Sequence, residues 1–245
     1  MTPLSRASAL EERTGVPGLS NHRRRISIEV SGSGVGVSGL YLHPEKSRFL
    51  FVFGHGAGAG MTHSFMESMA QKLALRGIAS LRYQFPYMEE GRKRPDQKPV
   101  LLATVRSAVR EACKLDGSLP ILAGGKSMGG RMTSLALAEE PLSEVRALVF
   151  FGFPLHPPDS PSTGRAIHLS HVKVPMLFLQ GTRDKLADLK LLEPAVKKLR
   201  KLATLQIVEG ADHSFHVPRS LGKSDDAVLD HLSDVVISWT SRVVA

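Results

Sequence analysis

Short apolar runs alternate along this chain with longer stretches in which apolar residues recur at helical spacing. Short runs rich in aliphatic, β-branched and aromatic residues, bounded by turn-forming residues, predict strands. Eight such runs cover residues 26–30, 37–42, 49–53, 79–83, 119–123, 147–151, 176–179 and 204–208. The first two flank a Gly/Ser turn at 31–36, which predicts a hairpin, and several later runs are apolar throughout, as in strands covered on both faces.

Between these runs, apolar residues recur three and four positions apart, which predicts helices with one buried face. Gly77 and Gly117 mark the ends of the first two helices. The helical stretches are 65–74, 101–112, 132–138, 191–199 and 228–239. Strands that alternate with helices of this length indicate an α/β domain: a mostly parallel central sheet of about eight strands, with helices on both faces.

The N-terminal segment differs from the rest of the chain. Residues 1–24 mix Ser, Gly, Pro and charged residues without periodicity and end in a run of arginines. Such a composition buries little apolar surface, so we predict a flexible basic tail. The remaining length fits one large α/β unit, and we predict a single domain at 25–245.

The formal net charge of +9 raises nucleic acid as a partner. The basic residues, however, lie in the tail, in a loop at 92–94 beside acidic residues, and on one face of the helix near 197–201, with few aromatic residues among them. This pattern is typical of a solvated surface, so we expect no nucleic-acid partner.

The chain also lacks sequence features of membrane or secreted proteins. No apolar run approaches the length of a bilayer span, and the first 25 residues contain no apolar signal-peptide core. Its one cysteine, Cys113, falls in a helical stretch and leaves no internal disulfide to form. We therefore expect a cytoplasmic protein without a membrane partner.

A glycine-rich turn carries the strongest chemical signal. Residues 121–130 read Ile-Leu-Ala-Gly-Gly-Lys-Ser-Met-Gly-Gly, which places Gly125, Ser127 and Gly129 in the pattern G-x-S-x-G. An apolar run precedes the pattern and a helix-forming stretch follows it. A sharp strand-to-helix turn of this kind holds a serine in a strained, exposed conformation, whereas the alternative is an ordinary glycine-rich turn. The context favours Ser127 as a nucleophile.

A serine hydroxyl needs a base, usually a histidine that is oriented by a carboxylate. Asp184 follows the strand predicted at 176–179, and His213 follows the strand predicted at 204–208. Because parallel strands end at the same edge of a sheet, we expect both side chains near Ser127.

Each of these two residues has a rival. Asp188 lies four positions after Asp184 but falls at the start of the next helix, where an aspartate has a capping role. His216 lies three positions after His213, farther from the strand end. We prefer Asp184 and His213. No other cluster of His, Cys and Asp has the spacing of metal ligands, so we expect neither a metal nor a cofactor.

A second glycine-rich loop at 54–60 reads Gly-His-Gly-Ala-Gly-Ala-Gly directly after the strand at 49–53. It lacks the Lys-Ser/Thr of a phosphate-binding P-loop. Acyl transfer places negative charge on a carbonyl oxygen, which two fixed backbone N–H groups can bind. We predict Met128 and Ala57 as the two donors, with Gly58 as the alternative to Ala57, and expect His55 to hold the loop by hydrogen bonding.

Together and in this order, the elbow at Ser127, Asp184, His213 and the loop at 54–58 make the chain from residue 25 onward resemble the α/β-hydrolase superfamily. The resemblance implies the α/β-hydrolase fold, in which nucleophile, acid and base follow one another in this order. Within the superfamily the chain is similar to the small dienelactone-hydrolase-like branch that has no large cap domain. The interval 152–175 is too short for a cap, and its prolines indicate a flap or short helix.

For substrate contacts we predict Gly56, Gly58, Tyr87 and Phe153, in a site open enough for small or exposed esters. The role of Lys126, either local hydrogen bonding or a place on the rim, stays open. The prediction for the chain is a serine hydrolase that cleaves a small-molecule carboxylic ester, or a related acyl bond, through a Ser-His-Asp triad and an acyl-enzyme. The alternative is a non-catalytic scaffold or binding protein that retains the hydrolase fold.

Overall fold

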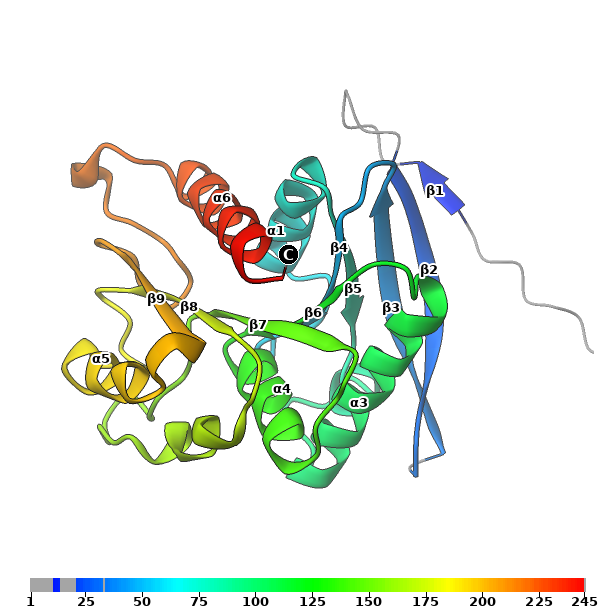
Figure 1. Cartoon of the computed structure of the whole chain (residues 1–245), viewed down its shortest axis with the longest axis horizontal. Coiled ribbons are helices and arrows are strands. Elements are labelled where there is room, and N and C mark those ends of the chain that lie inside the picture. The colour runs from blue at the N-terminus through cyan, green and yellow to red at the C-terminus, as the bar shows by residue number, and fades with distance from the viewer. Residues whose placement is uncertain (1–10, 14–20, 33, 245) are drawn as a thin grey trace, which may run out of the picture.

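A single nine-stranded sheet forms the centre of the molecule in the computed structural model, which describes residues 11–13, 21–32 and 34–244 (Figure 1). The strand order across the sheet is β1-β2-β3-β5-β4-β6-β7-β8-β9. The strands are β1 (Glu11–Arg13), β2 (Asn21–Val30), β3 (Val35–Pro44), β4 (Phe49–Gly54), β5 (Ile78–Tyr83), β6 (Ile121–Lys126), β7 (Val145–Phe151), β8 (Met176–Gly181) and β9 (Ala203–Val208).

Strands β4 to β9 are parallel, and β1 to β3 form an antiparallel edge that joins them through β3 and β5. The predicted mostly parallel sheet is confirmed, and the eight predicted runs fall in β2 to β9. β2 begins at Asn21, before the predicted run at 26–30, and β6 extends to Lys126 although Gly124 and Gly125 read as the start of a turn. These two glycines pair with Val149 and Phe150 of β7, so the backbone stays in the sheet up to the elbow.

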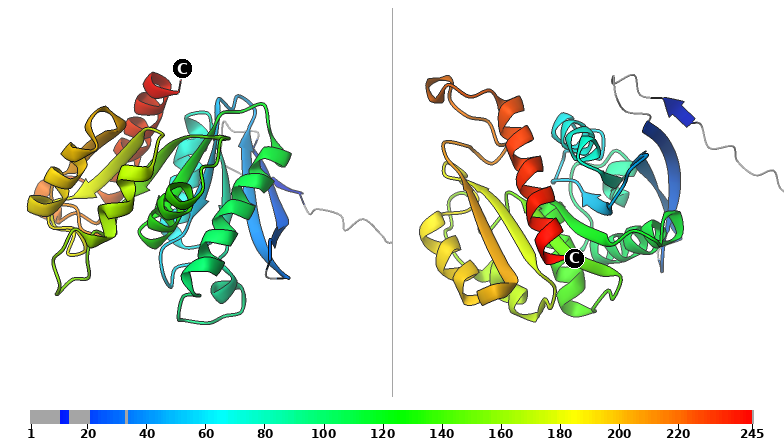
Figure 2. Two further views of the ribbon diagram at one scale, coloured as in Figure 1. Left: turned by 60° about the horizontal axis from the view of Figure 1, so that its bottom comes forward. Right: turned by 45° about the horizontal axis from the view of Figure 1, so that its top comes forward.

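Helices cover both faces of the sheet, as predicted (Figures 1 and 2). α1 and α6 lie on one face, and α3, α4 and α5 lie on the other. The helices are α1 (Ser64–Leu75), α2 (Pro86–Glu89), α3 (Lys98–Leu115), α4 (Met128–Glu139), α5 (Leu189–Lys198) and α6 (Asp225–Val243), with short 3-10 helices η1 (Gly164–His171), η2 (Arg200–Leu202) and η3 (Arg219–Leu221).

The side chains of β4 show how one strand serves two cores. Phe51 and Phe53 pack with the apolar residues of α1 and α6, whereas Leu50 and Val52 belong to the cluster that includes α3 and α4. Successive side chains of a strand point to opposite faces, so an unbroken apolar run is what a sheet with helices on both faces requires.

The antiparallel edge lies partly within the predicted tail. Residues 21–24 belong to β2 and pair with residues 41–44, and β1 pairs with residues 22–24. The Arg24 guanidinium lies 5.8 Å from the Tyr41 ring centroid, and Arg23 reaches Glu67 at 3.4 Å. Arginine stems can thus pack on a sheet edge while their charges are paired, which a composition rule does not register. Residues 1–10 and 14–20 of the predicted tail lie outside the described residues.

The interval between β7 and β8 contains only η1, so no large cap domain covers the carboxyl edge of the sheet. None of the described helices combines the length and the apolar character needed to span a bilayer.

Candidate active site

Ser127 lies at the turn between β6 and α4, where the sequence placed it. Its backbone has φ 50° and ψ −115°, a conformation that is unfavourable for a residue with a side chain. The Ser127 N–H donates to the carbonyl of Phe151 at 3.1 Å, which ties the turn to the neighbouring strand. The strained turn therefore holds the serine between a strand and a helix.

Two glycines allow this turn to pack tightly. A Cβ on Gly125 would lie 2.1 Å from the carbonyl oxygen of Gly54, and a Cβ on Gly129 would lie 2.3 Å from the same oxygen. Real Cβ atoms do not approach an oxygen so closely, so the strand β4 and the helix α4 can meet at the elbow only if both positions are glycine.

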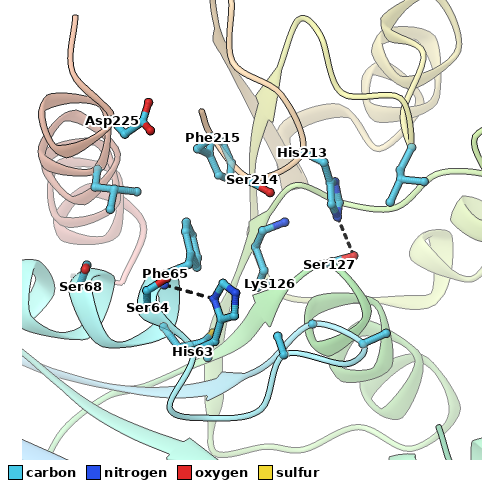
Figure 3. Close-up of a pocket in the computed structure, with 16 residues that line it drawn as sticks. His63, Ser64, Phe65, Ser68, Lys126, Ser127, His213, Ser214, Phe215 and Asp225 are labelled. Atoms are coloured by element: carbon cyan, nitrogen blue, oxygen red, sulfur yellow. Dashed lines mark hydrogen bonds between the residues drawn. The ribbon is translucent and has the colours of Figure 1, made fainter. Parts of the chain in front are cut away.

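His213 and Asp184 come together with Ser127 at the carboxyl edge of the sheet. Nε2 of His213 lies 2.9 Å from Oγ of Ser127 (Figure 3), and Nδ1 lies 2.7 Å from Oδ2 of Asp184. Asp184 and His213 are 29 positions apart along the chain, and Ser127 and His213 are 86 positions apart. Each of the three residues follows a different strand. The arrangement is a continuous hydrogen-bonded line from a hydroxyl through an imidazole to a carboxylate.

The Asp184 carboxylate is buried and held on both oxygens. Oδ1 accepts from the Leu186 N–H at 2.8 Å, and Oδ2 accepts from the Gln180 side-chain amide as well as facing His213. An ionised carboxylate offers several acceptor positions, and these donors fill them without competing for His213. The orientation of the carboxylate is therefore fixed before any ligand enters.

The rival residues lie elsewhere. Asp188 caps α5, with Oδ1 accepting from the Lys190 N–H at 2.9 Å. His216 is exposed and pairs with Asp225 at 2.8 Å. Neither makes a hydrogen bond to Ser127 or His213 in the described part of the chain.

His55 holds the glycine loop, as expected. Its Nδ1 lies 2.8 Å from the Gly56 carbonyl, and its Nε2 accepts from the Phe85 N–H at 3.1 Å. A carbonyl can only accept, so Nδ1 carries the proton and the ring is neutral. Burial also lowers the pKa of His55 to about 4, which keeps the ring in this form near neutral pH.

The two candidate donors of the glycine loop, the N–H groups of Ala57 and Gly58, differ in whether they already donate a hydrogen bond. The Gly58 N–H donates to the Tyr87 hydroxyl at 3.2 Å. By contrast, the N–H groups of Ala57 and Met128 donate no hydrogen bond within the described residues. Met128 is the first residue of α4, so its N–H lies at the positive end of a helix.

A cavity of about 470 Å³ opens beside Ser127. It runs from the serine and His213 toward the start of α1 and α6 (Figure 3). Its walls are mostly apolar, with a few polar groups near the serine. The lining residues are Gly56, Ala57, Ala59, His63, Ser64, Phe65, Met66, Ser68, Lys126, Ser127, Leu186, His213, Ser214, Phe215, Asp225 and Leu229.

Three predicted substrate contacts need correction, while Gly56 does line the cavity. Tyr87 is fully buried in the short helix α2, and its hydroxyl supports the Gly58 N–H from behind the loop. Phe153 packs against Phe150 and Phe178 in the core. Gly58 is not among the residues that line the cavity, and its N–H donates to the Tyr87 hydroxyl. Tertiary packing decides which of these residues line the cavity, and their positions in the sequence did not indicate it.

Sequence reasoning missed most of the apolar wall. Phe215 lies two residues after His213, and Phe65 lies at the start of α1 just after the glycine loop. This proximity in sequence to predicted site residues is the signal that could have indicated both phenylalanines. Their rings are stacked with centroids 5.9 Å apart. Lys126 lines the same wall with a buried side chain.

No group of His, Cys, Asp and Glu among the described residues is arranged to hold a metal ion. Ser127, His213 and Asp184 are instead hydrogen-bonded to one another.

The comparison with known proteins agrees with this geometry. Residues 47–241 match the family described as alpha/beta hydrolase domain. The chain belongs to this family. The match covers the glycine loop, the elbow, Asp184 and His213.

Among solved structures, this alpha/beta hydrolase is similar to dienelactone hydrolase from Anabaena variabilis ATCC 29413, with 23% identity, a TM-score of 0.69, and coverage of 90% of this chain and 98% of the other. A cold-adapted esterase from an Arctic intertidal metagenomic library shares 24% identity and a TM-score of 0.64, with 91% and 96% covered. Est1E from Butyrivibrio proteoclasticus, solved with bound ferulic acid, shares 17% identity and a TM-score of 0.68, with 89% and 99% covered. At such low identity these likenesses establish the dienelactone-hydrolase-like fold.

Proposed function

We propose that this protein is a serine hydrolase that cleaves a carboxylic ester, or a related acyl bond, in a small molecule. The observation that carries the proposal is the hydrogen-bonded line from Ser127 Oγ through His213 to Asp184, with distances of 2.9 and 2.7 Å. The same hydrogen-bonded arrangement of serine, histidine and aspartate serves nucleophilic acyl transfer on several unrelated folds.

In the first step, Ser127 Oγ attacks the acyl carbon and His213 Nε2 accepts the hydroxyl proton. The imidazolium that forms faces the Asp184 carboxylate through Nδ1–H. Because Asp184 is fixed by Gln180 and Leu186, it holds the ring in the tautomer that leaves Nε2 free to accept a proton.

The negative charge on the carbonyl oxygen needs donors that are already in place. The N–H groups of Met128 and Ala57 suit this role because Met128 directly follows Ser127 and Ala57 lines the same cavity. Neither N–H is committed to an acceptor among the described residues. The Gly58 N–H is engaged by Tyr87, so Ala57 is the better candidate of the two loop residues.

The intermediate then collapses: the bond to the leaving group breaks, and His213 donates its proton to the departing oxygen. A water molecule then takes the place of the leaving group. His213 removes a proton from this water, and the resulting hydroxide attacks the acyl carbon of the acyl-enzyme. The serine leaves with the proton from His213, which releases the carboxylic acid and restores the site.

The relatives support an ester as the substrate. One of the similar structures is a cold-adapted esterase, and another protein, Est1E, was solved with bound ferulic acid. The absence of a large cap over 152–175 leaves the cavity accessible to small or exposed esters.

The test is labelling of the purified protein with a fluorophosphonate probe, which reacts with activated serines. We expect wild-type protein to be labelled at Ser127, and Ser127→Ala and His213→Ala to remain unlabelled. Turnover of a p-nitrophenyl ester should fall about 10⁶-fold in Ser127→Ala.

Ser134 provides a matched control. It forms the second Ser–His pair of the described residues, 2.8 Å from Nε2 of His168, but it is fully buried and its hydroxyl donates to the Arg131 carbonyl. Ser134→Ala should therefore be labelled like the wild type. Absence of labelling in folded wild-type protein, or labelling that survives Ser127→Ala, would contradict the proposal.

A further inference from the structure

The cavity beside Ser127 contains a buried ammonium that makes no hydrogen bond within the described part of the chain. Lys126 is the last residue of β6, and its side chain is only 9% exposed. Its Nζ lies 5.8 Å from the ring centroids of both Phe65 and Phe215. Figure 3 shows the side chain reaching into the middle of the pocket, with the two rings on one side and His213 on the other. Nζ has no hydrogen-bond partner among the described residues.

The carboxylates around this ammonium are already engaged. Asp184 is held by His213, Gln180 and Leu186, as described above. Asp212 accepts from the N–H groups of Ser214 and His216 at 2.8 and 3.0 Å. Asp225, on the α6 side of the pocket, pairs with His216 and accepts from the Val217 N–H. Each nearby carboxylate therefore has hydrogen-bond donors other than Lys126, and although Asp184 and Asp212 attract the ammonium, none of the described residues accepts a hydrogen bond from Nζ.

A buried ammonium without a partner is unfavourable, since it has lost its hydration and gained no hydrogen bond. Burial lowers the pKa of Lys126 to about 8, against the attraction of Asp184 and Asp212. A group with this pKa is still mostly protonated near pH 7. Two aromatic faces compensate part of the cost, but they leave the three N–H donors unused.

We propose that the substrate carries a carboxylate that binds Lys126, so that the enzyme acts on anionic esters. This inference rests on the proposed function and names the substrate class for the same site. The substrate carboxylate supplies the hydrogen-bond acceptor that Nζ lacks among the described residues, while the ester carbonyl lies at Ser127. The walls formed by Phe65, Phe215 and Leu229 accommodate a short apolar chain between the two groups.

The first measurement is a comparison of hydrolysis between monomethyl and dimethyl esters of succinate, glutarate and adipate. Each pair shares its carbon chain, and in the dimethyl ester a second, neutral methyl ester replaces the carboxylate. The series covers different distances from the ester to the carboxylate. We expect kcat/KM to favour the monomethyl ester by about tenfold or more for at least one length, since a charge-assisted hydrogen bond contributes that much. In Lys126→Met the preference should be lost.

Lys197→Met is the matched control because it removes one positive charge from an exposed position on α5. The preference should persist in this variant, which separates a contact in the pocket from the net charge of the protein. An unchanged preference in Lys126→Met, or no preference in the wild type, would overturn the inference. Ser127-dependent hydrolysis of the dimethyl esters would still uphold the proposed function in that case.

Binding decides the inference even if no ester is turned over. In Ser127→Ala, calorimetry should show monomethyl glutarate, succinate or adipate binding about tenfold more tightly than the dimethyl ester, and Lys126→Met in the same background should remove the difference. Equal affinities in both backgrounds would refute it.

Because Lys126→Met removes an unpaired charge and keeps the apolar stem, its melting temperature should be no lower than that of the wild type. Lys126→Gln provides a second neutral variant for the same measurements.

Discussion

At the scale of single residues, contacts separate candidates that the sequence left close together. Asp184 and Asp188 are four positions apart, yet one is buried against His213 and the other caps a helix. The sequence supported this choice through the helix-start position of Asp188. It could not show that Gln180 and Leu186 hold the Asp184 carboxylate, because these contacts depend on how β8 ends.

Substitution of each aspartate in turn tests which of the two orients His213 and which caps α5. Asp184→Asn should lower kcat about 10⁴-fold, because the neutral amide stabilises the wrong tautomer of His213. Asp188→Ala should retain kcat and lower the free energy of unfolding by about 1 kcal/mol through loss of the α5 cap. Steady-state kinetics and urea unfolding measure both effects. An inactive Asp188→Ala beside an active Asp184→Asn would reverse the assignment.

His55 predicts a pH dependence of stability. Its folded-state pKa of about 4 lies below the value of about 6.5 for an unfolded histidine. The unfolded chain therefore binds a proton between pH 6.5 and 4 that the folded chain does not, so stability is full above pH 6.5 and is lost as the pH falls toward 4.

In His55→Gln, the slope of unfolding free energy against pH should decrease by up to about 1.4 kcal/mol per pH unit in this window. Urea unfolding at several pH values measures the slope. His231→Gln, at an exposed position of α6, is the control and should keep the wild-type slope. Equal slopes in His55→Gln and the wild type would contradict the argument.

At the scale of elements, the elbow depends on close contact between β6, β4 and α4. The sequence predicted the strand, the serine and the helix, but ended the strand before Gly124 because paired glycines usually indicate a turn. The observed strand continues to Lys126, since β7 supplies pairing partners for both glycines. The short helix α2 was missed for a related reason: a charged, proline-containing segment resembled a loop, although Tyr87 within it is buried.

Gly129→Ala tests the packing at the elbow. Its Cβ would meet the Gly54 carbonyl oxygen at 2.3 Å, so β4 or α4 must move. We expect a loss of about 3 kcal/mol or more in unfolding free energy, and a loss of turnover because Ser127 moves with α4. Gly164→Ala is the control, since its Cβ meets nothing closer than Ser162 Oγ at 4.0 Å, and should change stability by less than about 0.5 kcal/mol. Similar stabilities for both variants would show that the elbow tolerates a Cβ.

At the scale of the whole molecule, the sheet carries one core on each face and gathers the site at one edge. The two faces follow from the unbroken apolar strands, which the sequence contains. The antiparallel edge strand β2 was predicted to begin later, because the arginines before it resembled a tail. In the structure Arg23 pairs with Glu67 of α1, so the edge is connected to the helix beside the pocket.

Truncation measures what this edge contributes. Deletion of residues 1–24 removes the pairing of 21–24 with β3 and the contacts of Arg23 and Arg24, and should lower the melting temperature by about 3–8 °C. Deletion of residues 1–10 leaves every contact of the described residues in place and should shift the melting temperature by less than about 1 °C. Equal melting temperatures for the two truncations would show that residues 21–24 contribute nothing.

The sequence by itself determined the class of fold, the order of strands and helices along the chain, and the three residues at the carboxyl edge. These features depend on local periodicity, on glycine spacing and on the rule that parallel strands end together. Only the tertiary structure decided which loop amide is uncommitted, that Tyr87 and Phe153 lie outside the pocket lining, and that Lys126 Nζ has no hydrogen-bond partner among the residues the structure describes. Those properties arise from contacts between β6, α1 and the loop after β9, and residues far apart in sequence leave no local pattern of their contacts.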